Sequence, residues 1–444
     1  MAKVINAVAQ ALEHLDVANR RVCVGLSGGL DSVVLLTALR ELAPLRNFDL
    51  GAAHINHGLN PRAHEWVRFC TNLCRELDVP LVVETVVVDL NAGLGTEAAA
   101  RAARYEAFAK IETDFLALAH HADDQVETLL IQLLRGSGAA GLSAMPGERV
   151  LVDQGARLLR PLLALARSEL EQFAGQRSLE WVEDDSNADL SLDRNFLRHS
   201  LLPVLAKRFP AYRETLYRVT RNLADAAELV NVLGQQDMIL LRDAGAPGGG
   251  LRIDVLREWP GSRALNALRC VFRTQGYSLP HRAALEEALR QVLEARQSAA
   301  VRVDFGNVSL RRYRDHCFLV GNQELPAGWS AKWTGQDSVS LPSGLGALRF
   351  RRDRGAGLSV QALQGVDLSV SFRRGGERLA VAANRPHRDL RKLFQEAGIA
   401  PWVRERTPVV LCGKRVAFVP GLGLAAEFQG KPGEPSIEIE WIQR

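Results

Sequence analysis

A stretch near the N-terminus has the composition of a phosphate-binding turn. Residues 22–36 read VCVGLSGGLDSVVLL, an apolar run followed by Ser27-Gly28-Gly29 and then a second apolar run. Consecutive glycines let backbone N–H groups converge on one point, and the N-terminus of a following helix adds a positive dipole end there. This strand–turn–helix therefore suits an anion, and we expect a phosphate. The alternative is an ordinary turn in which Ser and Asp only cap the helix.

A second group of polar residues with chemical potential lies at residues 120–128, HHADDQVET. Asp124 and Glu127 are three residues apart, so a helix places both carboxylates on the same face. The alternative is that these acids only cap the helix N-terminus, where negative charge is favourable. Zinc is disfavoured, because adjacent histidines after a strand point to opposite sides and no third ligand has the right spacing.

The order of the elements predicts that these two groups meet. Apolar runs typical of strands alternate with helical stretches, at residues 22–26, 48–54, 81–88 and 115–119. This alternation predicts a doubly wound parallel sheet with helices on both faces. Ligands bind at the carboxyl ends of the strands in such sheets. Three polar segments follow those ends, at residues 27–32, 54–59 and 120–124.

The 444 residues are too many for one ordinary core, so we expect several domains. Helical patterns dominate from residue 209 to 294 with short strands after them, and the last part is rich in strands with one helix near residues 389–397. We therefore expect an α/β protein of three domains. These are a doubly wound parallel-sheet domain over 1–208, a mostly helical middle domain over 209–325 and a small α+β domain over 326–444.

The composition is that of a soluble globular protein. Hydrophobic residues make up 47% and charged residues 24%, with a net charge of +4. No run approaches the ~18 apolar residues of a membrane span, and the first residues form an amphipathic helix rather than a signal peptide. The six cysteines include no C-x-x-C pair, which fits a reducing compartment. We expect a cytoplasmic protein with no membrane partner.

Several motifs together resemble one enzyme family. The Gly-rich turn is not a Walker loop, since no Lys follows the glycines, but SGGLDS matches the SGGxDS loop of the PP-loop ATP pyrophosphatase superfamily. With the other motifs, the chain resembles tRNA(Ile)-lysidine synthetase. One departure is Asn384, where the family often has Gly, and it affects only the shape of a loop. The motifs that carry the resemblance are HINHGL at 54–59, Arg101 with Arg104-Tyr105, HHADDQVET at 120–128, RGSG at 135–138, Arg160-Pro161-Leu162, Arg194-Asn195 with Arg198-His199, and the segment 373–408.

The resemblance implies that the chain ligates L-lysine to the wobble cytidine of the CAU anticodon of tRNA(Ile). ATP would adenylate the C2 oxygen of that cytidine and release pyrophosphate, and the lysine side-chain amine would then displace AMP. The tRNA would change from methionine to isoleucine identity. Carried onto this sequence, the residues that bind ATP are Ser27, Gly28, Gly29, Leu30, Asp31 and Ser32, with Asp31 facing Mg2+.

This chemistry gives roles to the acidic pair and to nearby basic residues. The lysine amine, with a reference pKa of about 10.4, must lose a proton before it attacks. We expect Glu127 to hold lysine, and Asp124 to act as the general base or to position magnesium or substrate. Arg101 or Arg104 is expected to steady the phosphate or nucleotide, the alternative being exposure to solvent. The other expected substrate contacts in this half are His57, Arg194 and Arg198.

A concentration of positive charge marks the C-terminal part as the expected tRNA clamp. Between residues 372 and 416 there are eleven Lys and Arg against four Asp and Glu, a local excess larger than that of the whole chain. Phosphate contacts from this segment would position the tRNA, and the alternative is a solvated face. Phe394 and Trp402 are expected in the core rather than stacked on bases. The expected substrate contacts are Arg385, Arg388 and Lys392.

Two other functions, that of a tRNA thiolase and that of a noncatalytic RNA-binding protein, are alternatives to the ligase. A PP-loop tRNA thiolase needs persulfide or cluster cysteines, and the lack of paired cysteines disfavours it. A nucleotide-sensing RNA-binding protein without catalysis is disfavoured by Asp31, Asp124 and Glu127. The middle domain is expected to bind tRNA by its position in the family alone, and a homodimer is left open.

Overall fold

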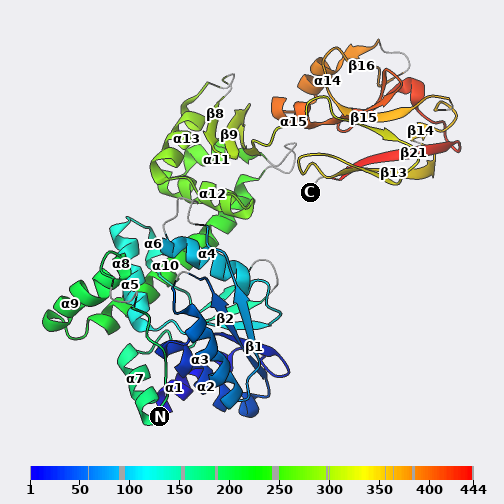
Figure 1. The fold of residues 1–444 in the computed structure, drawn as a ribbon. Coiled ribbons are helices and arrows are strands. Elements are labelled where there is room, and N and C mark those ends of the chain that lie inside the picture. Colours follow the sequence, from blue (N-terminus) through cyan, green and yellow to red (C-terminus); the bar gives the residue numbers. More distant parts are fainter. Residues whose placement is uncertain are drawn as a thin grey trace. The chain divides into compact units, whose positions relative to one another are not determined.

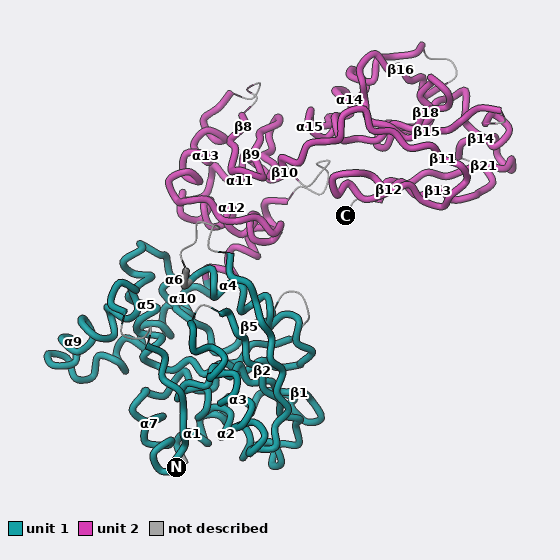
Figure 2. The backbone as a smooth tube through the Cα atoms, in the orientation of Figure 1, with its two compact units in different colours: residues 1–229 teal, residues 230–444 magenta. Residues whose placement is uncertain are grey.

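The structure is a computed structural model that describes residues 2–58, 60–89, 96–151, 156–185, 189–242, 250–296, 299, 301–355, 357–363, 365–382 and 386–442. The chain forms two compact units, residues 1–229 and residues 230–444 (Figure 2). The helix α10 (Tyr212–Leu241) runs from the first unit into the second. The boundaries of the three expected domains stay a prediction.

The first unit, in which Figure 1 labels β1 and β2, is built on a six-stranded sheet with the order β3-β2-β1-β4-β6-β5. Its strands are β1 (Arg21–Gly25), β2 (Asp49–Asn56), β3 (Leu81–Thr85), β4 (Phe115–Ala117), β5 (Glu148–Val150) and β6 (Arg157–Leu159). Neighbouring strands are parallel except for the edge pair of β5 and β6. The predicted parallel sheet is therefore confirmed. The sequence pattern does not reveal β5 and β6, because strands of three residues are too short to show an alternation.

Helices cover both faces of this sheet. Val22 and Val24 of β1 belong to a core shared with α1, α2 and α7, whereas Cys23 between them belongs to a smaller core that includes Phe108 of α4. Burial on both faces is the reason that β1 reads as a continuous apolar run. The helices are α1 (Ala2–Glu13), α2 (Leu30–Arg46), α3 (Ala63–Glu76), α4 (Thr96–Phe108), α5 (Ala122–Leu134), α6 (Ala139–Leu142), α7 (Arg167–Gln176), α8 (Asp193–Phe196) and α9 (Leu202–Arg208).

The strand order reverses at β1, and this reversal positions the site. The chain runs outward from β1 through β2 to β3 and then returns to β4 on the other side of β1. Val24 of β1 lies opposite Ala117 of β4 in a parallel register. The loops that follow these two strands therefore leave the same edge of the sheet side by side. The first leads into α2 and the second into α5, so the Gly-rich turn adjoins the HHADD segment.

The second unit begins with a helical region backed by a small antiparallel sheet. Three helices and the end of α10 share one core with four strands in the order β7-β10-β9-β8. The helices α12 and α13 and the strands β8 to β10 correspond to the elements predicted from the sequence. Their bounds are α11 (Ile253–Glu258), α12 (Gly261–Thr274), α13 (Arg282–Glu294), β7 (Leu251–Arg252), β8 (Arg302–Phe305), β9 (Val308–Tyr313) and β10 (His316–Gly321).

The rest of the second unit is rich in strands, as predicted. One sheet has the order β11-β15-β18-β19-β20, another the order β12-β13-β21-β14, and β16 pairs with β17. Phe394 is fully buried in the core on α14, whereas Trp402 of α15 packs against Phe318, with ring centroids 5.4 Å apart. The bounds are β11 (Ser330–Trp333), β12 (Ser338–Ser340), β13 (Ala347–Arg354), β14 (Leu358–Ser359), β15 (Leu368–Phe372), β16 (Arg378–Leu379), β17 (Arg388–Asp389), α14 (Leu390–Glu396), α15 (Pro401–Arg406), β18 (Pro408–Cys412), β19 (Arg415–Val419), β20 (Gly423–Leu424) and β21 (Pro435–Ile442).

No helix among the described residues has the length and hydropathy needed to cross a bilayer.

The two glycines of the turn differ in how much they are needed. Gly28 has φ +91°, and a Cβ built there would lie 2.9 Å from Val182 Cγ2, whereas Gly29 has φ −74° and its nearest neighbour would be Ser27 Oγ at 3.5 Å. We expect Gly28→Ala to destabilise the first unit by about 1–3 kcal/mol, since it adds both a strained φ and a clash. Gly29→Ala is the matched control and is expected to stay within about 0.5 kcal/mol. Thermal unfolding of both variants is the measurement, and equal midpoints would contradict the assignment.

Candidate active site

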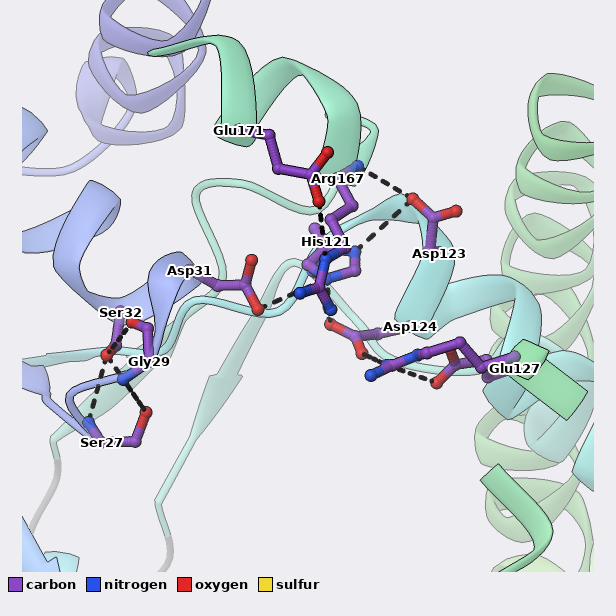
Figure 3. Close-up of polar contacts among 11 residues, drawn as sticks. Ser27, Gly29, Asp31, Ser32, His121, Asp123, Asp124, Glu127, Arg167 and Glu171 are labelled. Carbon is purple, nitrogen blue, oxygen red and sulfur yellow. Dashed lines mark hydrogen bonds and ion pairs between the residues drawn. The ribbon is translucent and has the colours of Figure 1, made fainter. Parts of the chain in front are cut away.

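The Gly-rich turn directs backbone N–H groups at one point. The N–H groups of Ser27 and Gly28 both donate to the Ser32 Oγ at 3.2 Å. That hydroxyl in turn donates to the carbonyl of Gly29 at 2.9 Å, and the N–H of Gly29 donates to Ser27 Oγ at 3.3 Å (Figure 3). The N-terminus of α2 follows at Leu30. Converging N–H groups at a helix N-terminus form a concavity that favours an anion.

Asp31 lies in the first turn of α2 and points out of the turn toward α5 (Figure 3). Its Oδ2 is 3.6 Å from His121 Nε2. Its Oδ1 is buried and has no hydrogen-bond partner among the described residues. A buried carboxylate oxygen without a donor is suited to a cation.

The N-terminus of α5 gives its two aspartates different surroundings. Asp124 Oδ2 accepts the N–H of His121 at 3.0 Å, so this residue does cap the helix. Asp123 accepts the N–H of Arg167 at 2.9 Å and forms an ion pair with Arg213. Asp123 therefore connects α5 to α7 and α10. The second oxygen of Asp124, Oδ1, lies on the side of Glu127 (Figure 3).

His121 connects the turn to α5 and is the residue that the sequence analysis missed. Its side chain is 1% exposed, and Nε2 lies 3.6 Å from Asp31 Oδ2 and 3.5 Å from Asp124 Oδ2. Burial alone would lower the pKa of His121, but the hydrogen bond to Asp31 and the charges of Asp124, Asp31 and Asp123 outweigh it and raise the pKa above its ordinary value. Asp31 and Asp124 thus share one imidazole, which brings the turn and the acidic helix into one site. The signal in the sequence was the HH pair, which was examined only as a zinc ligand.

Glu127 is fully buried one turn further along α5, on the same face as Asp124. Arg198 binds both of its oxygens, with Nε 2.8 Å from Oε1 and Nη2 3.1 Å from Oε2, and the same Nη2 lies 3.5 Å from Asp124 Oδ1. Burial raises the pKa of the Glu127 carboxyl, and the opposing effect of Arg198 does not fully offset it. Arg198 belongs to a single π-helical turn, Leu197–Leu201, between α8 and α9.

The other expected site residues of the first unit contact different groups. Arg101 is half-buried and donates to the Tyr105 hydroxyl at 3.3 Å, and Arg194 donates to Thr128 Oγ1 at 3.2 Å. Burial lowers the pKa of His57, and the charge of the exposed Arg104 lowers it further. The structure therefore places Arg104 near His57, on the side of β2 and α4, and Arg194 on the side of α5.

The pKa of His120 depends on several of these charges. Its pKa is lowered to about 3, chiefly by burial and further by the charges of Arg160, Arg101 and Arg194, with Asp124 as a partial offset. His120 is thus neutral at physiological pH, whereas the pKa of the neighbouring His121 is raised. The two adjacent histidines, which the sequence does not distinguish, have opposite electrostatic surroundings.

Many basic side chains between residues 372 and 416 form ion pairs or hydrogen bonds within the chain. Arg388 forms an ion pair with Glu396, with Nη1 2.8 Å from Oε2, whereas Lys392 is exposed on α14. Arg385 lies outside the described residues. Further basic side chains of this segment that contact protein groups are Arg373 with Glu377, Arg378 with the His387 carbonyl, Arg404 with the Ile399 carbonyl and Arg415 with Glu427.

Comparison with known proteins finds three family models along the chain. They are a PP-loop domain over residues 2–205, a TilS substrate binding domain over residues 251–318 and a TilS substrate C-terminal domain over residues 368–441.

Curated relatives align along nearly the whole chain. The chain is 38% identical to the tRNA(Ile)-lysidine synthase of Nitrosomonas europaea over 95% of this chain and 92% of that one. It is 41% identical to the tRNA(Ile)-lysidine synthase of Alkalilimnicola ehrlichii over 93% of this chain and 92% of that one. Identity of this extent, together with the PP-loop turn and its acidic helix, shows that the chain belongs to the tRNA(Ile)-lysidine synthase family.

Proposed function

We propose that this chain uses ATP to join L-lysine to the wobble cytidine of the CAU anticodon of tRNA(Ile), with release of AMP and pyrophosphate. The observation that carries the proposal is the single His121 imidazole between Asp31 and Asp124, which puts a phosphate-binding turn and an acidic pair into one site. The names of the relatives support tRNA(Ile) as the substrate.

The turn is proposed to hold ATP during the first step. The pyrophosphate end is proposed to replace the Ser32 hydroxyl as the acceptor of the Ser27 and Gly28 N–H groups. The other residues of the turn are Gly29, Leu30 and Ser32. Asp31 is proposed to hold Mg2+, because its buried Oδ1 has no partner among the residues that the structure describes. When bound, Mg2+ offsets the negative charge of the phosphates beside this carboxylate. The described residues include no group of three or more His, Cys, Asp or Glu that could hold a metal on its own.

The acidic pair is proposed to act in the second step. The lysine Nζ forms a bond to C2 of the adenylated cytidine, the bond from C2 to the AMP oxygen breaks, and one amine proton leaves. Glu127 holds the ammonium group through its charge in a buried environment. Asp124, which also caps α5, is the proposed acceptor of the proton or positions magnesium or substrate. Arg101 or Arg104 steadies the nucleotide during adenylation.

A thiolase of the same superfamily is the competing function, and the cysteines argue against it. All six are free and buried. Burial raises the pKa of Cys23, Cys70 and Cys317 to about 12, so their thiols are protonated and unreactive at neutral pH. Free buried thiols are also consistent with our proposal of a cytoplasmic location.

Asp31→Asn tests the first step. We expect pyrophosphate release to fall by about 100-fold or more, since the amide cannot balance a cation held between phosphates. Binding of tRNA should be nearly unchanged because Asp31 belongs to the ATP side of the site. Asp78→Asn is the matched control, since Asp78 is exposed in a left-handed backbone conformation that Asn tolerates. A large loss of tRNA affinity in Asp31→Asn would refute the assigned role.

Glu127→Gln tests the lysine site. We expect the KM for lysine to rise by about 10- to 100-fold, the range that corresponds to loss of a charge-assisted hydrogen bond, while the KM for ATP changes less than about twofold. Glu171→Gln on α7 is the control, because Glu171 pairs with Arg167 in a largely exposed position. Steady-state kinetics with each substrate varied in turn is the measurement. Equal increases for lysine and ATP would count against Glu127 as the lysine holder.

The double variant Arg391→Ala/Lys392→Ala tests the C-terminal contact with tRNA. Both side chains are exposed on α14. We expect weaker tRNA binding and a salt dependence whose slope is smaller by about 1 to 2, because each phosphate contact releases counterions. Arg46→Ala/Arg75→Ala removes the same charge from the last turns of α2 and α3, where both side chains are exposed, and serves as control. An unchanged slope in the α14 variant would show that this helix faces solvent in the complex.

A further inference from the structure

The buried carboxylate of Glu127 in the proposed lysine site already has a cationic partner within the chain. Both Glu127 oxygens accept hydrogen bonds from one guanidinium, that of Arg198, at 2.8 and 3.1 Å. The same guanidinium reaches Asp124 Oδ1 at 3.5 Å. Arg198 therefore spans the two carboxylates that the proposed function assigns to a cationic amino acid.

Burial explains why a cation must be present here. The Glu127 side chain is 0% exposed, and a buried carboxylate without a positive partner is strongly unfavourable. The Glu127 side chain has no exposed surface while this guanidinium lies on both of its oxygens, and two cations on one buried carboxylate would repel each other, so an incoming ammonium group takes the place of the guanidinium rather than joining it. The acidic pair thus has two alternative counter-cations, one belonging to the chain and one belonging to the substrate.

The local structure around Arg198 allows its side chain to move away from Glu127. Its side chain is 26% exposed, so one end already reaches solvent. It lies in the π-helical turn Leu197–Leu201, between the four-residue α8 and the seven-residue α9. A π-helical turn has an extra residue relative to an α-helix and is found frequently at functional sites. By contrast, Glu127 is fixed inside the regular helix α5.

We infer, on the basis of the proposed function, that Arg198 is a tethered counter-cation that occupies the amine subsite at Glu127 and is displaced by the side-chain ammonium of lysine. Displacement exchanges one cation for another, so the buried carboxylate stays paired throughout. A neutral side chain of similar length cannot replace the guanidinium without leaving Glu127 unpaired. Arg198 is therefore a specificity-determining residue that favours cationic amino acids over neutral ones.

The test is calorimetric titration of the full chain with L-lysine in the absence of tRNA, at pH 8.5, which favours the ionised Glu127 carboxyl. Arg198→Met removes the competitor, and we expect lysine to bind about tenfold more tightly, the ratio given by about 1.4 kcal/mol. The effect should vanish when Arg198→Met is combined with Glu127→Gln, because the two side chains act on one site. Arg208→Met removes a charge from the exposed end of α9, where Arg208 stacks over Phe209, and should leave lysine binding unchanged.

The outcomes separate this inference from the proposed function. If Glu127→Gln alone leaves lysine binding unchanged, the proposed lysine site is wrong. If Glu127→Gln weakens lysine binding but Arg198→Met weakens it too or leaves it unchanged, the lysine site stands and Arg198 is not a competitor. Should Arg198→Met not fold, Arg198→Lys carries the test. A single ammonium cannot bind both oxygens as the guanidinium does, so we expect lysine to bind severalfold more tightly than in the parent chain, and equal or weaker binding would overturn the inference.

Discussion

The structure of the site depends on one buried imidazole that lies between two carboxylates. His121 is 1% exposed, and its Nε2 is 3.6 Å from Asp31 and 3.5 Å from Asp124. Two aspartates approaching this closely would repel each other without a positive group between them. The imidazole lies between the two carboxylates and connects the start of α2 with the start of α5. A turn suited to phosphates and a helix suited to an ammonium group thereby belong to the same small region.

This contact is available only because of the strand order. β1 pairs with β2 on one side and with β4 on the other, so the loops after β1 and β4 start next to each other. His121 sits at the start of α5 as its N-cap residue, and Asp31 sits in the first turn of α2. The two helix N-termini therefore converge, and their positive dipole ends favour the anionic groups of both aspartates and of a nucleotide. The reversal of strand order at β1 thus determines which side chains share the site.

The sequence predicts the parts of the site that are local along the chain. The turn Ser27–Ser32 is recognisable because its glycines and following helix are contiguous, and the shared face of Asp124 and Glu127 follows from a spacing of three. The pairing of Glu127 with Arg198 is not recognisable in this way, because the two residues are 71 positions apart and meet only through the packing of α5 against the π-helical turn. The role of His121 was missed for a related reason. It depends on two acids from separate loops, whereas the HH pair by itself draws attention to metal binding.

The number of Lys and Arg residues in the C-terminal segment does not show how many of them are available to a ligand. A count of Lys and Arg treats every cation as available, but Arg388 is bound by Glu396 and Arg404 donates to a backbone carbonyl. An arginine already held by a carboxylate adds little to the field felt by a phosphate, because its charge is balanced nearby. The exposed cations of α14, Arg391 and Lys392, retain that capacity. The charge that this region offers to the proposed tRNA contact is therefore smaller than the composition indicates, and it is concentrated on the exposed cations of α14.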